Sequence, residues 1–171
     1  MAGSSHNFGG PILADTTYIN NKKVQTNVKF ELPSLENVTA EIQAMGKYGV
    51  PLRGYFNDAE HKCTFDRLDE VILEAFEPKD TTIEHRWVQV EIQPDGTEVD
   101  ISYKAFVKGR PKVAYPTSSL EVGNVPELEC TRTLSGLTVY RNGKELLAFD
   151  RFTQTYRVNG KDYYRDLEQY L

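Results

Sequence analysis

The side chains best able to do nucleophilic or metal chemistry in this chain are three histidines and two cysteines. His6, His61 and His85 are scattered along the sequence. Cys63 and Cys130 form no Cys-x-x-Cys pair, and neither has a histidine at a familiar metal-ligand spacing. We therefore expect His61 and His85 to be core or solvent-facing side chains. Both thiols should be buried or half-buried and reduced, and a disulfide between them is not indicated.

The sequence contains none of the motifs that commonly mark an enzyme. It lacks the His-Glu-x-x-His zinc motif, the Gly-x-Ser-x-Gly nucleophile elbow and the P-loop. Acidic pairs such as Asp69-Glu70, or Glu127 with Glu129, fall on predicted helix and strand faces, where such pairs are usually solvated. We therefore predict a protein that is not an enzyme and that has no metal site and no cofactor.

Length and charge favour a single acidic domain. The chain has 171 residues, enough to bury a core, and a net charge of -5. A protein that binds nucleic acid through its phosphates needs a basic surface, which this composition does not supply in bulk.

No apolar run approaches the ~20 residues that a membrane-spanning helix needs, so no stable membrane association is expected. The first residues, MAGSSHNFGG, do not read as a secretory signal. We expect a flexible N-terminal arm over residues 1–14 and one domain over residues 15–171.

Most of the chain has the pattern of antiparallel strands joined by tight turns. A first hairpin is predicted from Thr16 through a polar turn at Asn20-Asn21-Lys22 into a second arm over Val24 to Phe30. A longer hairpin pairs residues 82–92 with 97–108. Further strands are predicted at 55–65, 112–117, 127–134, 137–141, 144–150 and 153–158, and from Lys161 onward. Two Asn-Gly pairs, Asn142-Gly143 and Asn159-Gly160, mark tight turns.

One clear helix interrupts the strands. In DRLDEVILEAFEP, an apolar stripe recurs at helical spacing, with Asp66 as the expected N-cap and Pro78 as the stop. The stripe consists of Leu68, Val71, Ile72, Ala75 and Phe76. The last residues, DYYRDLEQYL, suggest a short amphipathic turn of helix. The predicted fold is therefore mainly β, an antiparallel β-sandwich or barrel with one flanking α-helix.

Residues 32–54 form a segment too long for an ordinary connection and too apolar for comfortable disorder. A short helix around Val38 to Met45 would place Val38, Ile42 and Met45 on one side. Two interpretations stay open. The segment could fold back on its own core, or it could be an apolar extension that packs on another subunit.

The return arm of the long hairpin separates apolar from polar residues. Val99, Ile101, Tyr103, Ala105 and Val107 alternate with Glu98, Asp100, Ser102 and Lys104. Such an arm suits a sheet with one face in the core and the other facing water or a channel.

Two stretches resemble the major tail tube proteins of contractile-tailed bacteriophages. ELPSLENVTAEI, from Glu31 to Ile42, resembles the segment in which those proteins leave their first hairpin for a long loop. Near the C-terminus, Gly-Lys-Glu-Leu (143–146), an aliphatic strand with Asp150, then Val-Asn-Gly (158–160) and a short charged tail follow in the family's order. The resemblance spans about Tyr18 to Leu171, and the Gly/Ser-rich first ten residues depart from it.

The resemblance implies a structural protein of a phage tail or a phage-tail-like particle, made in the bacterial cytoplasm. Such proteins fold as a β-barrel-like sandwich, join as six-membered rings by sheet pairing and stack into the hollow inner tube of a contractile tail. Related tubes occur in contractile bacteriocins and type VI secretion. The implied partners are further copies of the chain, the tail sheath, the baseplate or tube initiator and the tape-measure protein. DNA passes through without specific binding, or the tube punctures a membrane.

The resemblance also assigns surfaces. The long loop would reach a neighbouring ring through an inter-ring contact set: Leu35, Ile42, Met45, Tyr48, Val50 and Leu52. Glu98 and Asp100 are candidates for the lumen wall, where acidic side chains would repel phosphate so that DNA slides. They could equally be ordinary acids of the outer surface. The alternative function is a small-ligand-binding β-barrel carrier, in which the same strands close around an apolar cavity.

Overall fold

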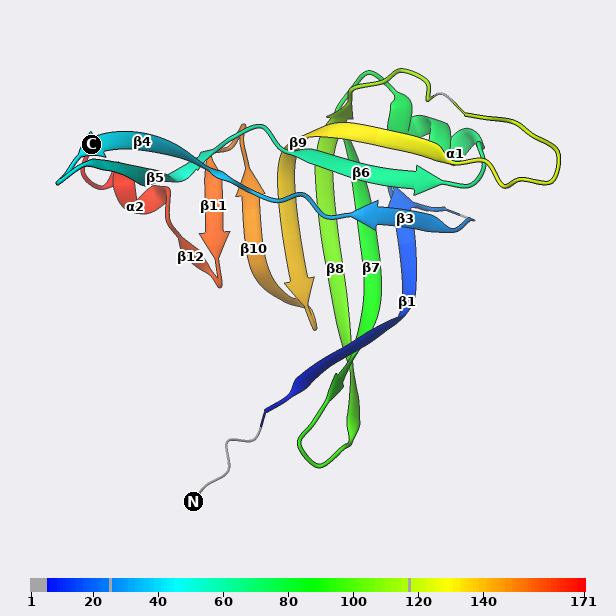
Figure 1. The fold of residues 1–171 in the computed structure, drawn as a ribbon, viewed down its shortest axis with the longest axis horizontal. Helices are drawn as coiled ribbons and strands as arrows, with labels where there is room; N and C mark the ends of the chain where they lie inside the picture. Colours follow the sequence, from blue (N-terminus) through cyan, green and yellow to red (C-terminus); the bar gives the residue numbers. More distant parts are fainter. Residues whose placement is uncertain (1–5, 25, 117) are drawn as a thin grey trace.

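The computed structural model describes residues 6–24, 26–116 and 118–171, and it is built almost entirely of antiparallel strands (Figure 1). The main sheet has the order β12-β11-β10-β9-β8-β7-β1-β2. Its strands are β1 (Phe8–Ile19), β2 (Lys22–Lys23), β7 (Thr81–Ile92), β8 (Glu98–Pro111), β9 (Leu128–Arg141), β10 (Lys144–Asp150), β11 (Thr155–Val158) and β12 (Lys161–Asp162). The prediction of a mainly β, sandwich-like fold with a small helix is confirmed.

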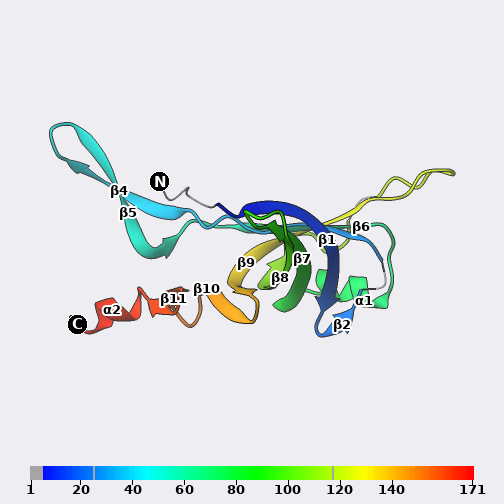
Figure 2. The same cartoon turned by 90° about the horizontal axis from the view of Figure 1, so that it is seen from below.

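A second, smaller layer lies over one face of the main sheet (Figures 1 and 2). It contains β3 (Val28–Glu31) and β6 (Glu60–Phe65), which pair with each other, while β6 also pairs with the first half of β9. Strand β9 therefore belongs to both layers. Its residues 128–133 pair with β6, and its residues 136–141 pair with β10.

The core consists of two apolar clusters. One fills the space between the layers and under the helix: Ile19, Val24, Val28, Cys63, Phe65, Ile72, Ala75, Phe76, Ile83, Leu128 and Cys130. The other lies toward β10: Phe56, Ala59, Val107, Leu134, Leu137 and Phe149.

In the described residues the sheet order ends at β12 and β2 without closing, so the strands form an open sandwich. A carrier needs a barrel closed around its ligand, and this open order gives that alternative no support.

The Asn-containing turns are confirmed. Asn20 and Asn21 have φ of 49° and 65°, and Asn142 and Gly143 have φ of 49° and 78°. Two successive residues with positive φ give the right-handed twist that two-residue hairpins need, and asparagine and glycine tolerate that conformation best. The long hairpin of β7 and β8 and the short terminal helix α2 (Arg165–Glu168) are also confirmed.

The predicted helix at Val38–Met45 is wrong. These residues belong to a second sheet, the hairpin of β4 (Asn37–Gln43) and β5 (Lys47–Phe56). Met45 and Gly46 turn the chain with φ of 53° and 121°. The apolar residues of this segment also have a helical spacing, but its β-branched residues favour a strand. That strand, β4, pairs with the glycine-containing β5 that follows it.

The main helix is shorter than predicted. It comprises α1 (Glu70–Leu73) and a 3-10 turn, η1 (Glu74–Phe76). Asp69, not Asp66, caps it by accepting a hydrogen bond of 2.9 Å from the Ile72 amide. Leu68 lies before the helix and is exposed, so only the later part of the apolar stripe packs into the core.

Several strand boundaries differ from the prediction, among them the strand expected at 55–65, which is divided between the end of β5 and β6. Only Val28 to Phe30 of the predicted arm over Val24 to Phe30 lie in a strand, β3, which pairs with β6 instead of β1; the partner of β1 is the short β2 at Lys22–Lys23, and residue 25 lies outside the described residues. Residues 112–116 are not a strand, since β8 ends at Pro111; Thr117 is not described. The strands at 127–134 and 137–141 are the single strand β9.

The expected flexible arm over residues 1–14 is wrong from Phe8 onward. Residues 8–14 form the first half of β1, which pairs with β7 as far as Phe8 opposite Ile92. Two register shifts between Gly9 and Ala14 let the strand follow the twist of the long hairpin. The boundary placed between residues 14 and 15 therefore falls inside a strand. Residues 1–5 lie outside the described part of the chain.

Candidate functional site

The β4–β5 hairpin projects away from the main sheet (Figure 2) and has one apolar face. Ile42 lies opposite Tyr48 and Ala40 opposite Val50, so these four side chains share a face; Glu41, opposite Gly49, lies on the other. The side chains of Ile42 and Tyr48 are 47% and 57% exposed. A hairpin with an exposed apolar face can bury that face only against another surface.

The six residues predicted for inter-ring contact divide into two groups. Ile42, Met45, Tyr48 and Leu52 are exposed on the hairpin, and Val50 is half-buried on it. Leu35 instead packs against the core cluster of Phe56 and Leu137 in its own chain. The beginning of this segment therefore folds back on its own core, and its remainder projects; packing of the projecting part on another subunit stays a prediction.

The base of the hairpin is fixed while its tip is free. The Arg151 guanidinium donates to the carbonyls of Phe56 and Asn57, and the Asn57 amide donates to the Glu36 carbonyl at 2.8 Å. Tyr55 packs on Tyr164 near the C-terminus, with ring centroids 6.2 Å apart. These contacts hold the direction of the projecting hairpin relative to the sheet.

The sheet has long unpaired edges. Strand β1 pairs with β7 from Phe8 to Ile19, with two register shifts, but within the described part of the chain only its Tyr18 and Ile19 pair with β2 on the other side. At the opposite edge, β12 covers only Arg157 and Val158 of β11. The β1 edge also carries exposed Phe8, a residue type that is costly to leave in water.

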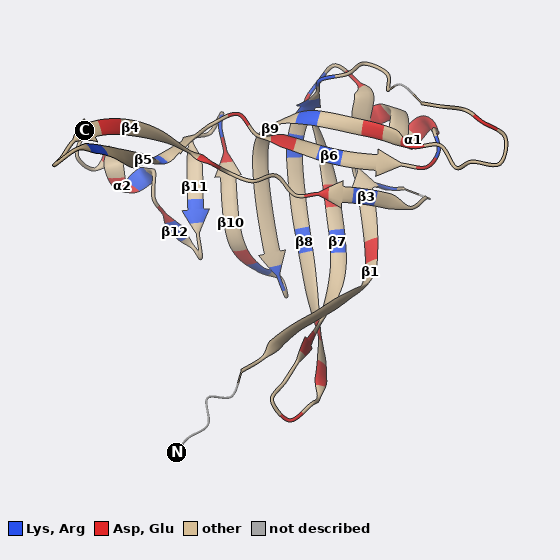
Figure 3. Cartoon of the chain, viewed as in Figure 1, with Lys and Arg blue, Asp and Glu red and all other residues tan. Residues whose placement is uncertain are grey.

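Glu98 and Asp100 are both exposed and lie toward the end of the β7–β8 hairpin. Acidic residues gather at this end, whereas Lys and Arg occur along the body of the strands (Figure 3). Because side chains alternate along a strand, Asp100 shares its face with Lys104 and Lys108. On this face, the exposed acidic residues Glu98 and Asp100 therefore lie at the hairpin end. Whether Glu98 and Asp100 line a lumen stays a prediction.

The same face of the body carries paired charges. Glu84 is buried and accepts from Arg86, and the Lys104 ammonium lies 3.8 Å from the Glu84 carboxylate. The Arg86 guanidinium also lies 4.5 Å from the centroid of the Tyr18 ring. We call this surface the uncovered face. It lies on the side of β7 and β8 that points away from β6, and it contains Glu84, Arg86 and Lys104.

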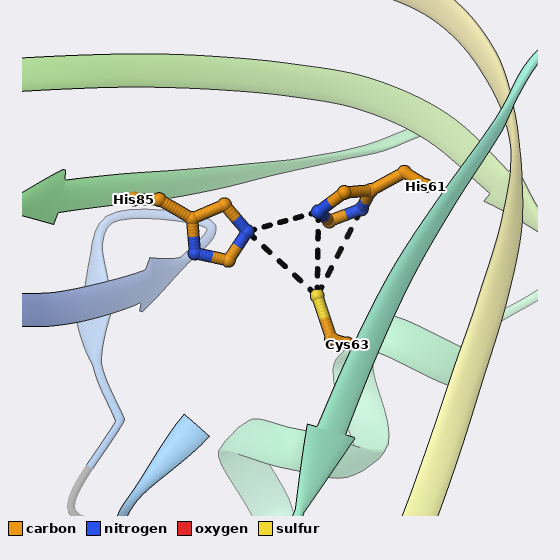
Figure 4. Close-up of side chains that lie close together, drawn as sticks. All are labelled: His61, Cys63 and His85. Atoms are coloured by element: carbon orange, nitrogen blue, oxygen red, sulfur yellow. Dashed lines mark hydrogen bonds between the residues drawn. The ribbon is translucent and has the colours of Figure 1, made fainter. Parts of the chain in front are cut away.

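A buried cluster of His61, Cys63 and His85 links the two layers (Figure 4). The two Nε2 atoms lie 2.9 Å apart, and the Cys63 Sγ lies 3.4 Å from His61 Nε2 and 3.7 Å from His85 Nε2. Both cysteines are buried, as predicted, and of the two environments expected for His61 and His85 the structure has the core. The signal that sequence reasoning missed is the spacing of His61 and Cys63, which are two residues apart and therefore lie on one strand face.

The surroundings of the cluster disfavour protonation of the two imidazoles. Burial lowers the pKa of His61 to about 3, and the Arg132 guanidinium contributes to the same shift. Burial lowers the pKa of His85 to about 2, with contributions from His61 and Arg132. Burial also raises the pKa of the Cys63 thiol, although Arg132 opposes that change. Both imidazoles are therefore neutral and able to use a nitrogen lone pair.

These features are those of a structural protein, with projecting apolar surface and open strand edges. Residues 12–171 match the family model of phage tail tube protein FII. Because this match covers nearly the whole chain, the chain belongs to the phage tail tube protein FII family, and it is a structural protein of a tail tube. The resemblance inferred from the two sequence stretches is confirmed.

Other comparisons are less informative. A search of curated protein sequences finds no significant match. Among solved structures, the chain is similar to the sheath/tube terminator of an extracellular contractile injection system, PVC, in its extended state. The identity is 15% over 76% of this chain and 95% of that chain, with a TM-score of 0.44, and this likeness supports no functional argument. None of the helices in the described residues is long and apolar enough to cross a membrane.

Proposed function

We propose that this chain self-assembles into six-membered rings that stack as the hollow inner tube of a contractile tail. Membership of the tail tube family supports the structural role. The single observation that carries the assembly proposal is the exposed apolar face of the projecting β4–β5 hairpin. A monomer gains nothing from holding Ile42, Met45 and Tyr48 in water, whereas a stacked ring would bury them.

Stacking would use the tip of this hairpin. Its base is held by Arg151 and Tyr164, so the tip extends at a fixed angle toward a neighbouring ring. A preorganised hairpin loses little conformational entropy when it docks, which leaves more of the apolar burial as net binding free energy. The contact set on the hairpin is Ile42, Met45, Tyr48, Val50 and Leu52.

Ring formation would use the open sheet edges. The unpaired side of β1 in one subunit would lie beside the β11 and β12 edge of the next, extending the sheet around the ring. Backbone pairing of this kind satisfies the free amides and carbonyls of both edges at once. The exposed apolar Phe8 on β1 would be buried at the same junction.

The uncovered face would line the bore, with Glu98 and Asp100 near one mouth. Glu84 neutralises part of the charge of Arg86 and Lys104, so this wall would attract phosphate only weakly. A surface with few free cations lets DNA slide instead of binding specifically. The further partners would be the sheath, the baseplate or tube initiator and the tape-measure protein, in a virion or a phage-tail-like particle.

The test replaces the apolar side chains of the hairpin tip. Ile42→Ser, Met45→Ser and Tyr48→Ser in one chain should raise the concentration needed for assembly by at least about 100-fold, because three buried apolar side chains contribute roughly 3 kcal/mol or more. Sedimentation velocity over a concentration series measures the assembly. The unfolding free energy of the monomer should change little, since all three side chains are exposed.

The matched control changes polar residues on the same hairpin. Glu41→Gln with Lys47→Gln removes an exposed ion pair of 3.5 Å and leaves the apolar face intact, so assembly should match the wild type. Assembly of the triple serine variant at the wild-type concentration would contradict stacking through this hairpin. A wild-type chain that stays monomeric and binds a small apolar ligand saturably would favour the carrier function instead.

A further inference from the structure

We propose that His61 Nε2, His85 Nε2 and Cys63 Sγ bind one Zn²⁺ ion between the two layers of the sandwich. All three ligand atoms lie within 4.8 Å of one another and all three residues are buried (Figure 4). This site is independent of the surfaces proposed for assembly. It would join β6, which carries His61 and Cys63, to β7, which carries His85.

The distances fit a tetrahedral ion. With Zn–N of about 2.0–2.1 Å and Zn–S of about 2.3 Å, neighbouring nitrogen ligands lie ~3.3 Å apart and nitrogen and sulfur ligands lie ~3.6 Å apart. The observed separations are 2.9 Å between the two nitrogens and 3.4 and 3.7 Å from sulfur to nitrogen. Completing the geometry would take changes of a few tenths of an ångström in these distances and a rotation of the His61 ring, since Cys63 Sγ now lies 3.8 Å from His61 Nδ1, beside the ring and not along the Nε2 lone pair. The fourth position would go to water.

Thr17 and Phe30 orient His85 for this role. The Thr17 Oγ1 lies 3.0 Å from His85 Nδ1, so a proton on Nδ1 can be donated to the hydroxyl and the Nε2 lone pair is left for the metal. Phe30 stacks on the same imidazole, with ring centroids 3.9 Å apart and planes 9° from parallel. The ring that presents Nε2 to Cys63 is thus held on two sides.

The ligand types and the nearby charge determine which metal ion the site should prefer and how tightly it should bind it. The donor set of two imidazoles and one thiolate suits zinc, which prefers nitrogen and sulfur ligands. One thiolate leaves the bound ion with a net positive charge, and the buried Arg132 guanidinium nearby opposes it. We therefore expect a weaker affinity than that of a site with two thiolates. Because the ligands are buried, the ion would enter while the chain folds.

The competing state is a metal-free cluster in which one imidazole donates a hydrogen bond to the other. Refolding the full chain with Co²⁺, a spectroscopic substitute for Zn²⁺, distinguishes the two states. The proposal predicts about one metal ion per chain by elemental analysis, a thiolate-to-cobalt charge-transfer band and the visible bands of tetrahedral cobalt. Thermal unfolding in excess Zn²⁺ should also occur at a higher temperature than in a chelator.

Variants assign the ligands. Cys63→Ser and His85→Gln should each weaken binding by at least about 100-fold and remove or shift the cobalt bands. Cys130→Ala is the matched control, because Cys130 is also buried and lies opposite Cys63 on β9 but is not among the three ligands. It should keep the stoichiometry and the spectrum.

The measurement on the wild-type chain does not depend on whether a variant folds. A wild-type chain that refolds with native circular dichroism in the presence of Co²⁺ and shows no thiolate charge transfer would overturn the proposal. Loss of binding in a folded Cys130→Ala chain, equal to that of Cys63→Ser, would overturn the assignment to these three residues.

Discussion

Arg132 shows how one buried side chain holds the two layers together. It is fully buried on β9, and its guanidinium donates to the carbonyl and the hydroxyl of Thr81, to the carbonyl of Gly109 at 2.6 Å and to that of Val107. Its Nε has no hydrogen-bond partner among the described residues. The guanidinium thus satisfies carbonyls at the start of β7 and near the end of β8, where the ladder changes register.

Removing this side chain should be costly. Arg132→Ala leaves several buried carbonyls without a donor and opens a cavity, so we expect the free energy of unfolding to fall by about 3–5 kcal/mol. Urea denaturation followed by circular dichroism measures the change. Arg110→Ala is the control, because Arg110 is exposed and pairs with Asp80 at 3.4 Å, and it should cost no more than about 1 kcal/mol. Equal losses in the two variants would contradict the assigned role of Arg132.

The sequence indicated whether a residue is buried better than it indicated which residues it contacts. The burial of both cysteines agrees with the sequence analysis, whereas for His61 and His85 the sequence left core and solvent-facing positions open, and both are buried. The cluster could not be predicted, because His85 comes from a strand in the other layer, and only the layer packing brings it to Cys63. The helix cap was missed by three residues for a similar reason, since Asp66 and Asp69 are both good caps and the core contact of Ile72 selects the later one.

At the scale of elements, the central feature is the bend that lets β9 serve both layers. Close to this bend, Gly109 of β8 approaches β9 closely, and a Cβ atom there would lie 2.4 Å from the Thr133 carbonyl oxygen. The neighbour is backbone, which cannot rotate away as a side chain can. Glycine at this position therefore permits the close strand contact where the register of β8 and β9 shifts between Lys108 and Gly109.

Substitution of this glycine should separate the strands. Gly109→Ala should lower the free energy of unfolding by roughly 2 kcal/mol or more, since the added methyl group overlaps fixed backbone. Gly49→Ala on β5 is a matched control: no atom lies within 4 Å of its Cβ position, so the change should stay within about 0.5 kcal/mol. Thermal or urea unfolding of both variants tests this expectation. A Gly109→Ala chain as stable as the Gly49→Ala chain would refute it.

Elements with local turn signals were predictable, and those set by distant pairing were not. Asn142-Gly143 and Asn159-Gly160 specify their turns within two residues, so both turns were predicted correctly. The β4–β5 hairpin was missed because its turn at Met45-Gly46 carries no strong signal and its apolar spacing also fits a helix. The division of Val24 to Phe30 depends on β6, more than thirty residues away along the chain.

At the scale of the whole molecule, the surfaces are arranged for contact on several sides. The hairpin tip, the unpaired edge of β1 and the edge at β11 and β12 are separate surfaces of the described chain (Figures 1 and 2). The sequence showed that β8 has one polar face, but not that its acids gather at the hairpin end while Arg86 and Lys104 pair with Glu84 on the body. That distribution depends on the register between β7 and β8.

The measurement that tests the central claim most directly is electron cryomicroscopy of the purified wild-type chain across a concentration series. The account predicts hollow particles of uniform width, built of six-membered rings, with the β4–β5 hairpin between stacked rings and the uncovered face of β7 and β8 toward the axis. Compact monomers at every concentration, or an assembly in which Ile42 and Tyr48 stay in solvent, would contradict it.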